Sequence, residues 1–162
     1  MTIPEILKEL EPYTGRFPMQ AMRAALAQRE AITPELLRVV EAVAQDPVAF
    51  AEREDYMLHL FRQSPYTTPS VAQCEEIVGG QVLNALIEQG RLVRLNEEVV
   101  FMTETYEQMR DRIVAFLREN ERITVAQVRD LFGASRKYAL ALANYLDEKR
   151  ITRRVGDDRV LR

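Results

Sequence analysis

Residues 133–162 read GASRKYALALANYLDEKRITRRVGDDRVLR, which is the pattern of a helix followed by a β-hairpin. Ser135 is a preferred first residue, or N-cap, for a helix. After that helix, two runs that favour strands, 151–155 and 159–162, flank Gly156-Asp157-Asp158, a composition typical of a hairpin turn. A helix followed directly by a hairpin is the closing half of a winged helix.

The residues before this stretch supply the rest of such a unit. The segment 107–120 carries apolar residues at the spacing of one buried helical face. Thr124 is placed to cap a short second helix, Gly133 predicts a turn, and the third helix then runs to about Glu148. Three helices and a hairpin predict a complete winged helix.

The same order of elements occurs sixty residues earlier. Two short helices separated by Gly79-Gly80 lead into a predicted hairpin with strands at 92–95 and 99–102. Arg94 then matches Arg154, and the acidic turn pairs match as well. The pattern therefore predicts a tandem duplication within the chain.

The first copy lacks an opening helix after residues 62–70, a linker rich in proline and hydroxyl side chains. Residues 53–62 can supply that helix, because they carry a one-sided apolar stripe. The stripe consists of Tyr56, Met57, Leu60 and Phe61.

Residues 1–61 read as short helices punctuated by proline, which is tolerated at the first helical position. Ile3–Leu7 resembles Thr33–Leu37, and a repeat of about thirty residues indicates stacked helix pairs. Thr33 and Asp46 are the predicted N-caps. The predicted helices are 3–11, 18–30, 34–45 and 47–62, the last with a break near Glu52 left open.

The predicted fold class is mainly α with small β-hairpin wings: an N-terminal array of short helices followed by tandem winged-helix domains. The predicted domains are a helical segment at 1–61, a winged helix at 62–104 and a second winged helix at 105–162.

The composition narrows the function classes. With 47% hydrophobic and 29% charged residues, the chain has the balance of a globular protein. It has no export signal and no apolar run long enough to span a membrane, and its single cysteine, Cys74, fits a reducing cytoplasm. One histidine, His59, and no phosphate loop predict a protein that is not an enzyme and has no cofactor, metal site or small-molecule substrate.

The net charge of −3 is unevenly distributed along the chain. Residues 133–162 hold eight basic and four acidic side chains, so this is where a polyanion is attracted. Arg136 and Lys137 fall in the first turn of the third helix, where cations oppose the helix dipole and stability alone does not favour them. With the amides there they can bind phosphate. We interpret neighbouring Tyr138 as a core residue in preference to a base-stacking one.

Arg153 and Arg154 form a second basic cluster, in the hairpin. Successive strand residues point to opposite faces, so these two cannot both face one ligand surface. We expect one of them to pack or pair internally, with Asp157 and Asp158 as turn residues and partners for the arginines.

The strings LFGASRKYAL at 131–140, YLD at 145–147 and TRRVGDDRVL at 152–161 resemble the final winged-helix domain of bacterial selenocysteine-specific elongation factors. Residues 64–102 resemble the winged helix just before it. In that family the last winged helix grips the apical part of a messenger-RNA hairpin that recodes a UGA stop codon, so the resemblance implies an RNA stem-loop as partner. It implies RNA contact at the matching basic positions: Arg136, Lys137, Arg153, Arg154 and Arg159.

The GTPase and transfer-RNA-binding domains of that family have no counterpart in these residues. Residues 1–61 are instead similar to an uncharacterised bacterial helical-repeat family. Two unrelated resemblances that meet near residue 62 are the pattern of a fused, rearranged or designed chain.

Two other functions stay open. The winged helices can serve as packing units of a structural or protein-interaction protein, or they can bind duplex DNA.

Overall fold

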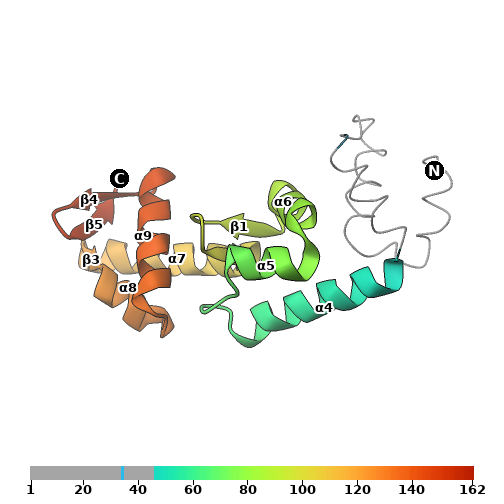
Figure 1. Cartoon of the computed structure of the whole chain (residues 1–162). Coiled ribbons are helices and arrows are strands. Elements are labelled where there is room, and N and C mark those ends of the chain that lie inside the picture. Colours follow the sequence, from blue (N-terminus) through green and yellow to red (C-terminus); the bar gives the residue numbers. More distant parts are fainter. Residues whose placement is uncertain (1–33, 35–45) are drawn as a thin grey trace. The chain divides into compact units, whose positions relative to one another are not determined.

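The computed structural model describes residue 34 and residues 46–162 (Figure 1). Pro34 is helical, as predicted. The helices predicted over 3–11 and 18–30, the rest of 34–45 and the N-cap Thr33 lie outside the described residues.

The chain divides into two compact units. The first unit consists of Met1–His59 and Gln73–Arg91, and the second of Leu60–Ala72 and Leu92–Arg162. The domain borders near residues 61 and 104 stay a prediction.

Helix α4, Pro47–Gln63, is continuous, which decides against the break near Glu52 that the sequence left open. Asp46 caps it as predicted, because its Oδ1 accepts a hydrogen bond from the Ala49 amide at 3.1 Å. Only part of the predicted apolar stripe is buried: Met57 and Phe61 are fully buried, Leu60 is half-buried, and Tyr56 is 56% exposed.

Helices α5, Val71–Val78, and α6, Gly80–Glu88, are separated by Gly79. Gly79 has a φ of 85°, which an L side chain rarely adopts, so glycine suits this turn. The buried face of α6 consists of Val82, Leu83, Ala85 and Leu86.

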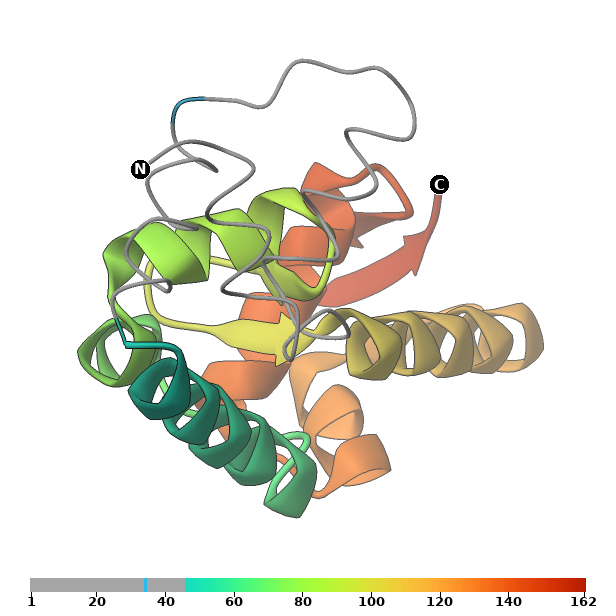
Figure 2. The ribbon, with the colours of Figure 1, turned by 90° about the vertical axis from the view of Figure 1, so that its right-hand side faces the viewer.

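The first hairpin pairs β1, Leu92–Arg94, with β2, Val100–Met102, in antiparallel register. Its turn is held by the Asn96 side chain, whose Oδ1 accepts hydrogen bonds from the amides of Glu98 and Val99 at 2.9 and 2.8 Å. The strand β2 leads directly into helix α7, as Figure 2 shows.

Helix α7, Thr103–Asn120, begins four residues before the predicted start at Glu107. Its N-cap is Met102, the last residue of β2, so no loop separates strand and helix. The buried face includes Tyr106 in the added first turn as well as the apolar positions that predicted the helix.

Helix α8, Val125–Phe132, starts with the predicted cap. Thr124 Oγ1 accepts from the Gln127 amide at 3.1 Å, and Gln127 Oε1 accepts from the Thr124 amide at 2.8 Å. This reciprocal pair is a capping box. Helix α9, Arg136–Glu148, follows with Ser135 at the N-cap position, although the serine side chain makes no capping hydrogen bond.

The second hairpin, called the wing here, consists of β4, Thr152–Val155, and β5, Asp158–Leu161. Because Val155 pairs with Asp158, only two residues form the turn, and the three-residue turn predicted from sequence is wrong. A short strand β3, Ile123–Thr124, adds to β5 and gives the sheet order β3-β5-β4.

The two hairpins share one local contact, while the tandem duplication itself stays a prediction. Arg94 Nε donates to the Asn96 carbonyl at 3.0 Å, and Arg154 Nε donates to the Gly156 carbonyl at 2.8 Å. After the turns the offset becomes fifty-nine, because Arg94 pairs with Val100 whereas Arg154 pairs with Arg159. Whether the first copy forms a complete winged helix stays a prediction.

The second unit has one hydrophobic core, to which α7, α8, α9 and the first hairpin contribute. Tyr66 of the linker adds to it, with its ring 5.4 Å from that of Phe132. The largest fully buried members are Phe101, Met109, Ile113 and Ile123.

Candidate nucleic-acid interface

Two predicted site residues, Arg136 and Lys137, open helix α9. Arg136 is exposed and makes no hydrogen bond or ion pair with any other residue that the structure describes. Lys137 is half-exposed, and its Nζ lies 3.2 Å from Glu98 Oε2 in the turn of the first hairpin. The first turn of α9 thus offers one unpaired cation and one loosely paired cation.

Tyr138, the next residue, is held by the chain itself. Its hydroxyl donates to the Thr68 carbonyl at 2.7 Å, and its ring centroid lies 6.1 Å from that of Phe101. Thr68 is in turn fixed by a 2.6 Å hydrogen bond from its hydroxyl to the Val100 carbonyl. The interpretation of Tyr138 as a packing residue is confirmed, and this side of the helix start is covered by the linker and the first hairpin.

The two arginines of β4 lie on opposite faces of the wing, as the strand geometry predicts. Arg153 pairs across the hairpin with Val160 and is exposed, with no ion pair to another described residue. Arg154 is also exposed, but its guanidinium folds over the turn, where Nη2 lies 3.4 Å from Asp157 Oδ1. The expectation that one of the pair is engaged internally is therefore confirmed for Arg154.

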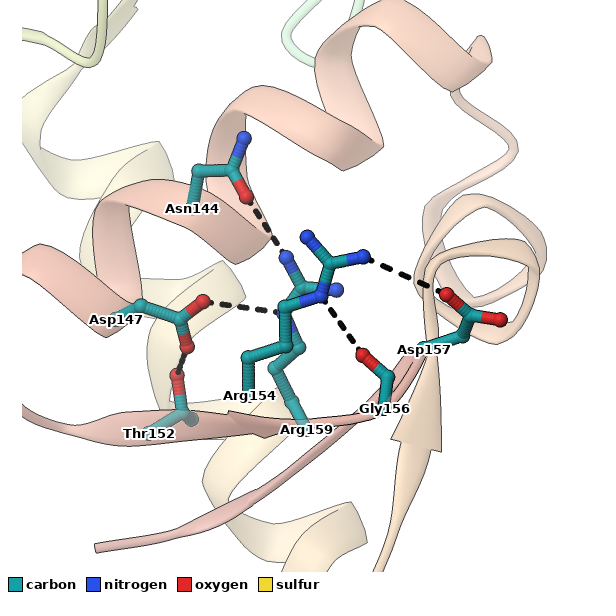
Figure 3. A network of polar contacts seen from close by, with 7 residues as sticks. All are labelled: Asn144, Asp147, Thr152, Arg154, Gly156, Asp157 and Arg159. Carbon is teal, nitrogen blue, oxygen red and sulfur yellow. Dashed lines mark hydrogen bonds and ion pairs between the residues drawn. The ribbon is translucent and has the colours of Figure 1, made fainter.

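Arg159 does not face outward, although the resemblance implies that it contacts RNA. Its side chain is only 4% exposed, and its Nε lies 3.1 Å from Asp147 Oδ2 on helix α9. Its Nη2 donates to Asn144 Oδ1 at 2.7 Å (Figure 3). Because Arg159 shares the inner face of the hairpin with Thr152, its guanidinium meets α9 instead of solvent.

The exposed cations therefore do not form one compact patch. Arg136 and Lys137 are at the start of α9, whereas the wing packs near its end, as seen in Figure 1. Arg136 and Asp147 are eleven positions apart, which corresponds to about 16 Å along the helix. The structure shows two basic regions along α9, and each includes an exposed arginine without an ion pair to another described residue, Arg136 in the first and Arg153 in the second.

Sequence reasoning missed Arg122, whose guanidinium lies 3.4 Å from the Asp158 carboxylate of β5. It precedes β3, a strand of two residues that is too short to leave a periodic pattern. The positive φ of Glu121, 63°, ends α7 and turns the chain towards the sheet. Arg122 thus adds an exposed cation beside the wing.

Two further side chains with reactive or metal-binding chemistry are Cys74 and His59. Cys74 is buried, and its burial raises the pKa of the thiol to about 11, in keeping with a packing residue. His59 is exposed on α4. In the described part of the chain, no three His, Cys, Asp or Glu residues are grouped to hold a metal ion. No helix there has the length and apolar character to cross a membrane.

Three helices and a three-stranded sheet closed by a hairpin define the second unit as a winged-helix protein fold. Residues 115–161 match the family described as the winged helix of elongation factor SelB. This segment is therefore a winged-helix domain of the SelB type. Residues 1–79 match a different family, a protein of unknown function (DUF1186).

Similar proteins agree with the first of these matches. A selenocysteine-specific elongation factor from Desulfomicrobium baculatum is 32% identical over 82 residues, which are 51% of this chain and 13% of that protein. The chain thus spans a small part of that relative.

Two solved structures share the fold. The mRNA-binding domain of elongation factor SelB from E. coli, in complex with SECIS RNA, matches with a TM-score of 0.57 and 21% identity. That match covers 71% of this chain and 98% of the other. A bacterial selenocysteine-specific elongation factor, EF-Sec, matches with a TM-score of 0.54 and 21% identity, over 68% of this chain and 18% of the other.

Proposed function

We propose that this chain is a non-enzymatic module that binds the hairpin of a messenger RNA through its C-terminal winged helix. The observation that carries the proposal is the exposed, unpaired state of Arg136 and Arg153 on a domain of the SelB type. The E. coli neighbour, an mRNA-binding domain solved with SECIS RNA, supports an RNA hairpin as the ligand. Such binding places the protein in the cytoplasm.

The ion pairs of the other two cations do not prevent RNA binding. Lys137 and Arg154 are 48% and 61% exposed, and their partners Glu98 and Asp157 are still more exposed. Ion pairs at such exposure contribute about 0–1 kcal/mol. A phosphate can therefore replace either carboxylate at little cost, and an arginine can bind it through two hydrogen bonds.

The setting of α9 favours an RNA hairpin over duplex DNA. A DNA-reading helix places its first turns in the major groove, but here Tyr138 is bonded to Thr68 and Lys137 to Glu98. With one side of the helix start covered by its own chain, α9 is poorly placed to enter a groove. RNA hairpins are bound through backbone phosphates and unstacked loop bases, for which two short basic regions suffice.

A double charge reversal, Arg136→Glu with Lys137→Glu, tests the proposal. We expect affinity for a stem-loop RNA to fall at least about tenfold, since two phosphate contacts become repulsive. The melting temperature should barely change, because both side chains are exposed. Filter binding measures the affinity, and Arg118→Glu with Arg129→Glu is the matched control, with the same change in net charge on α7 and α8.

Equal affinities of the two double variants would contradict the site. The same titration with duplex DNA and a scrambled RNA, at two salt concentrations, separates the alternatives. Tighter binding to duplex DNA would indicate a DNA-binding protein, and no saturable binding to any nucleic acid would indicate a structural or protein-interaction role.

We also infer that the chain is a fused, rearranged or designed one. Two different families match residues 1–79 and 115–161, which supports the inference. A structural or protein-interaction role of residues 1–79 is compatible with RNA binding by residues 115–161.

A further inference from the structure

A partly buried polar network joins the wing to helix α9 (Figure 3). Arg159 of β5 reaches two residues of the helix, with Nε 3.1 Å from Asp147 Oδ2 and Nη2 2.7 Å from Asn144 Oδ1. Asp147 is held in turn by Thr152 of β4, whose hydroxyl donates to Oδ1 at 2.6 Å. Both strands of the wing are thus bonded to one carboxylate of α9.

The first repeat shows that a hairpin of this kind does not need such a network. Val100 occupies the position of Arg159, because it is the cross-strand partner of Arg94 as Arg159 is of Arg154. Sixty residues before Asp147 and Thr152 stand Ile87 and Leu92. Val100 and Leu92 are both buried.

Apolar residues at these positions are therefore compatible with a buried hairpin. A buried ion pair contributes no more to stability than well-packed apolar side chains of similar volume, and often less. What an ion pair adds is a fixed geometry of the groups that it joins, because its hydrogen bonds form only within narrow ranges of distance and angle. The network in the second hairpin is thus better explained by fixed geometry than by stability.

We propose that Arg159, Asp147 and Asn144 are positioning residues that fix the wing on α9 and thereby set the directions in which Arg153 and Arg154, on its opposite faces, meet the RNA. The proposal rests on the proposed function. Arg154 lies directly across the hairpin from Arg159, and Arg153 is its neighbour in β4. Any rotation of the wing about α9 would move both guanidinium groups, so the three bonds of Arg159 and Thr152 set where the cations point.

The substitution Asp147→Ala tests this role, with Glu148→Ala as the matched control. Each removes one carboxylate from the last turn of the same helix, and Glu148 makes no hydrogen bond or ion pair with another described residue. Electrostatics alone predicts that both variants bind a stem-loop RNA slightly more tightly. If Asp147 positions the wing, Asp147→Ala should instead weaken stem-loop binding, with a loss of affinity of at least about threefold.

Equal affinities of the two variants would overturn the proposal. A second arm uses the background Arg153→Ala with Arg154→Ala. There Asp147→Ala should cause no further loss, since it acts through those two arginines; an undiminished loss in this background would also overturn the proposal.

Two further measurements guard against misfolding and against failure of the proposed function. Asn144→Ala removes one hydrogen bond at an exposed position, so this variant should fold and should also lose affinity for the stem-loop. Unchanged affinity counts against the network.

Amide hydrogen exchange of the free protein should be faster in the wing of Asp147→Ala than in the wing of Glu148→Ala, and equal rates would overturn the proposal without any RNA. If the unchanged chain binds no stem-loop, the proposed function fails, while exchange still decides whether the network holds the wing.

Discussion

Cys74 on α5 is a buried thiol whose pKa is raised from 9.0 to about 11. Desolvation is the main cause, because a thiolate loses its hydration inside the protein. The folded chain therefore holds this proton more tightly than the unfolded chain does. The resulting contribution to stability is complete below pH 9 and is lost as the pH rises through about 11.

We expect the melting temperature of the unchanged chain to fall more steeply between about pH 8 and 11 than that of Cys74→Ala. Circular dichroism at a series of pH values measures both curves. Burial also raises the pKa of Tyr106, but both chains carry this residue, so its contribution cancels in the comparison. Parallel curves would show that Cys74 is not responsible.

The fate of individual arginines shows what sequence can and cannot predict at this scale. Strand alternation places Arg153 and Arg154 on opposite faces, and this much follows from the sequence. Burial of Arg159 does not, because it depends on a helix fifteen and twelve residues away presenting Asn144 and Asp147 to the inner face of the wing. Of the five predicted site residues, four are exposed and only Arg159 is buried.

Helix α8 depends on its capping box, in which Thr124 and Gln127 satisfy each other's amides. Replacement of Thr124 by alanine should lower the free energy of unfolding by about 1 kcal/mol, since one amide loses its acceptor. Urea denaturation measures this loss. Thr105→Ala on α7 is the control, where alanine's higher helix propensity predicts no loss; an equal midpoint for both variants would contradict the role of the cap.

Local signals explain which elements the sequence predicts correctly. The Thr-x-x-Gln signature gives the start of α8, and the glycine at 133, with a φ of 61°, gives its end. The start of α7 is missed because β2 enters the helix without a linking loop, so no turn residue marks the boundary. Strand β3 is missed because two residues carry no period, and only its pairing with β5 makes it a strand.

The whole chain combines two family matches; the change of sequence character near residue 62 predicts two parts, but the first match extends past it to residue 79. What the sequence does not show is that Gln73–Arg91 groups with the residues up to His59. Such grouping depends on packing between segments far apart in the chain. A boundary read from linker composition therefore need not coincide with a boundary between compact units.

The net charge of −3 makes the whole molecule a poor ligand for RNA unless the cations of α9 and the wing act locally. If Arg136, Lys137, Arg153 and Arg154 each neutralise one phosphate, the slope of log affinity against log salt should be about −3. Raising the salt from about 50 to 200 mM should then weaken stem-loop binding roughly 60-fold. Arg136→Ala with Lys137→Ala should halve the slope, because two of four counterion-releasing contacts are gone. Filter binding at several salt concentrations measures both slopes, and a slope near zero in the unchanged chain would mean that these side chains do not contact phosphates.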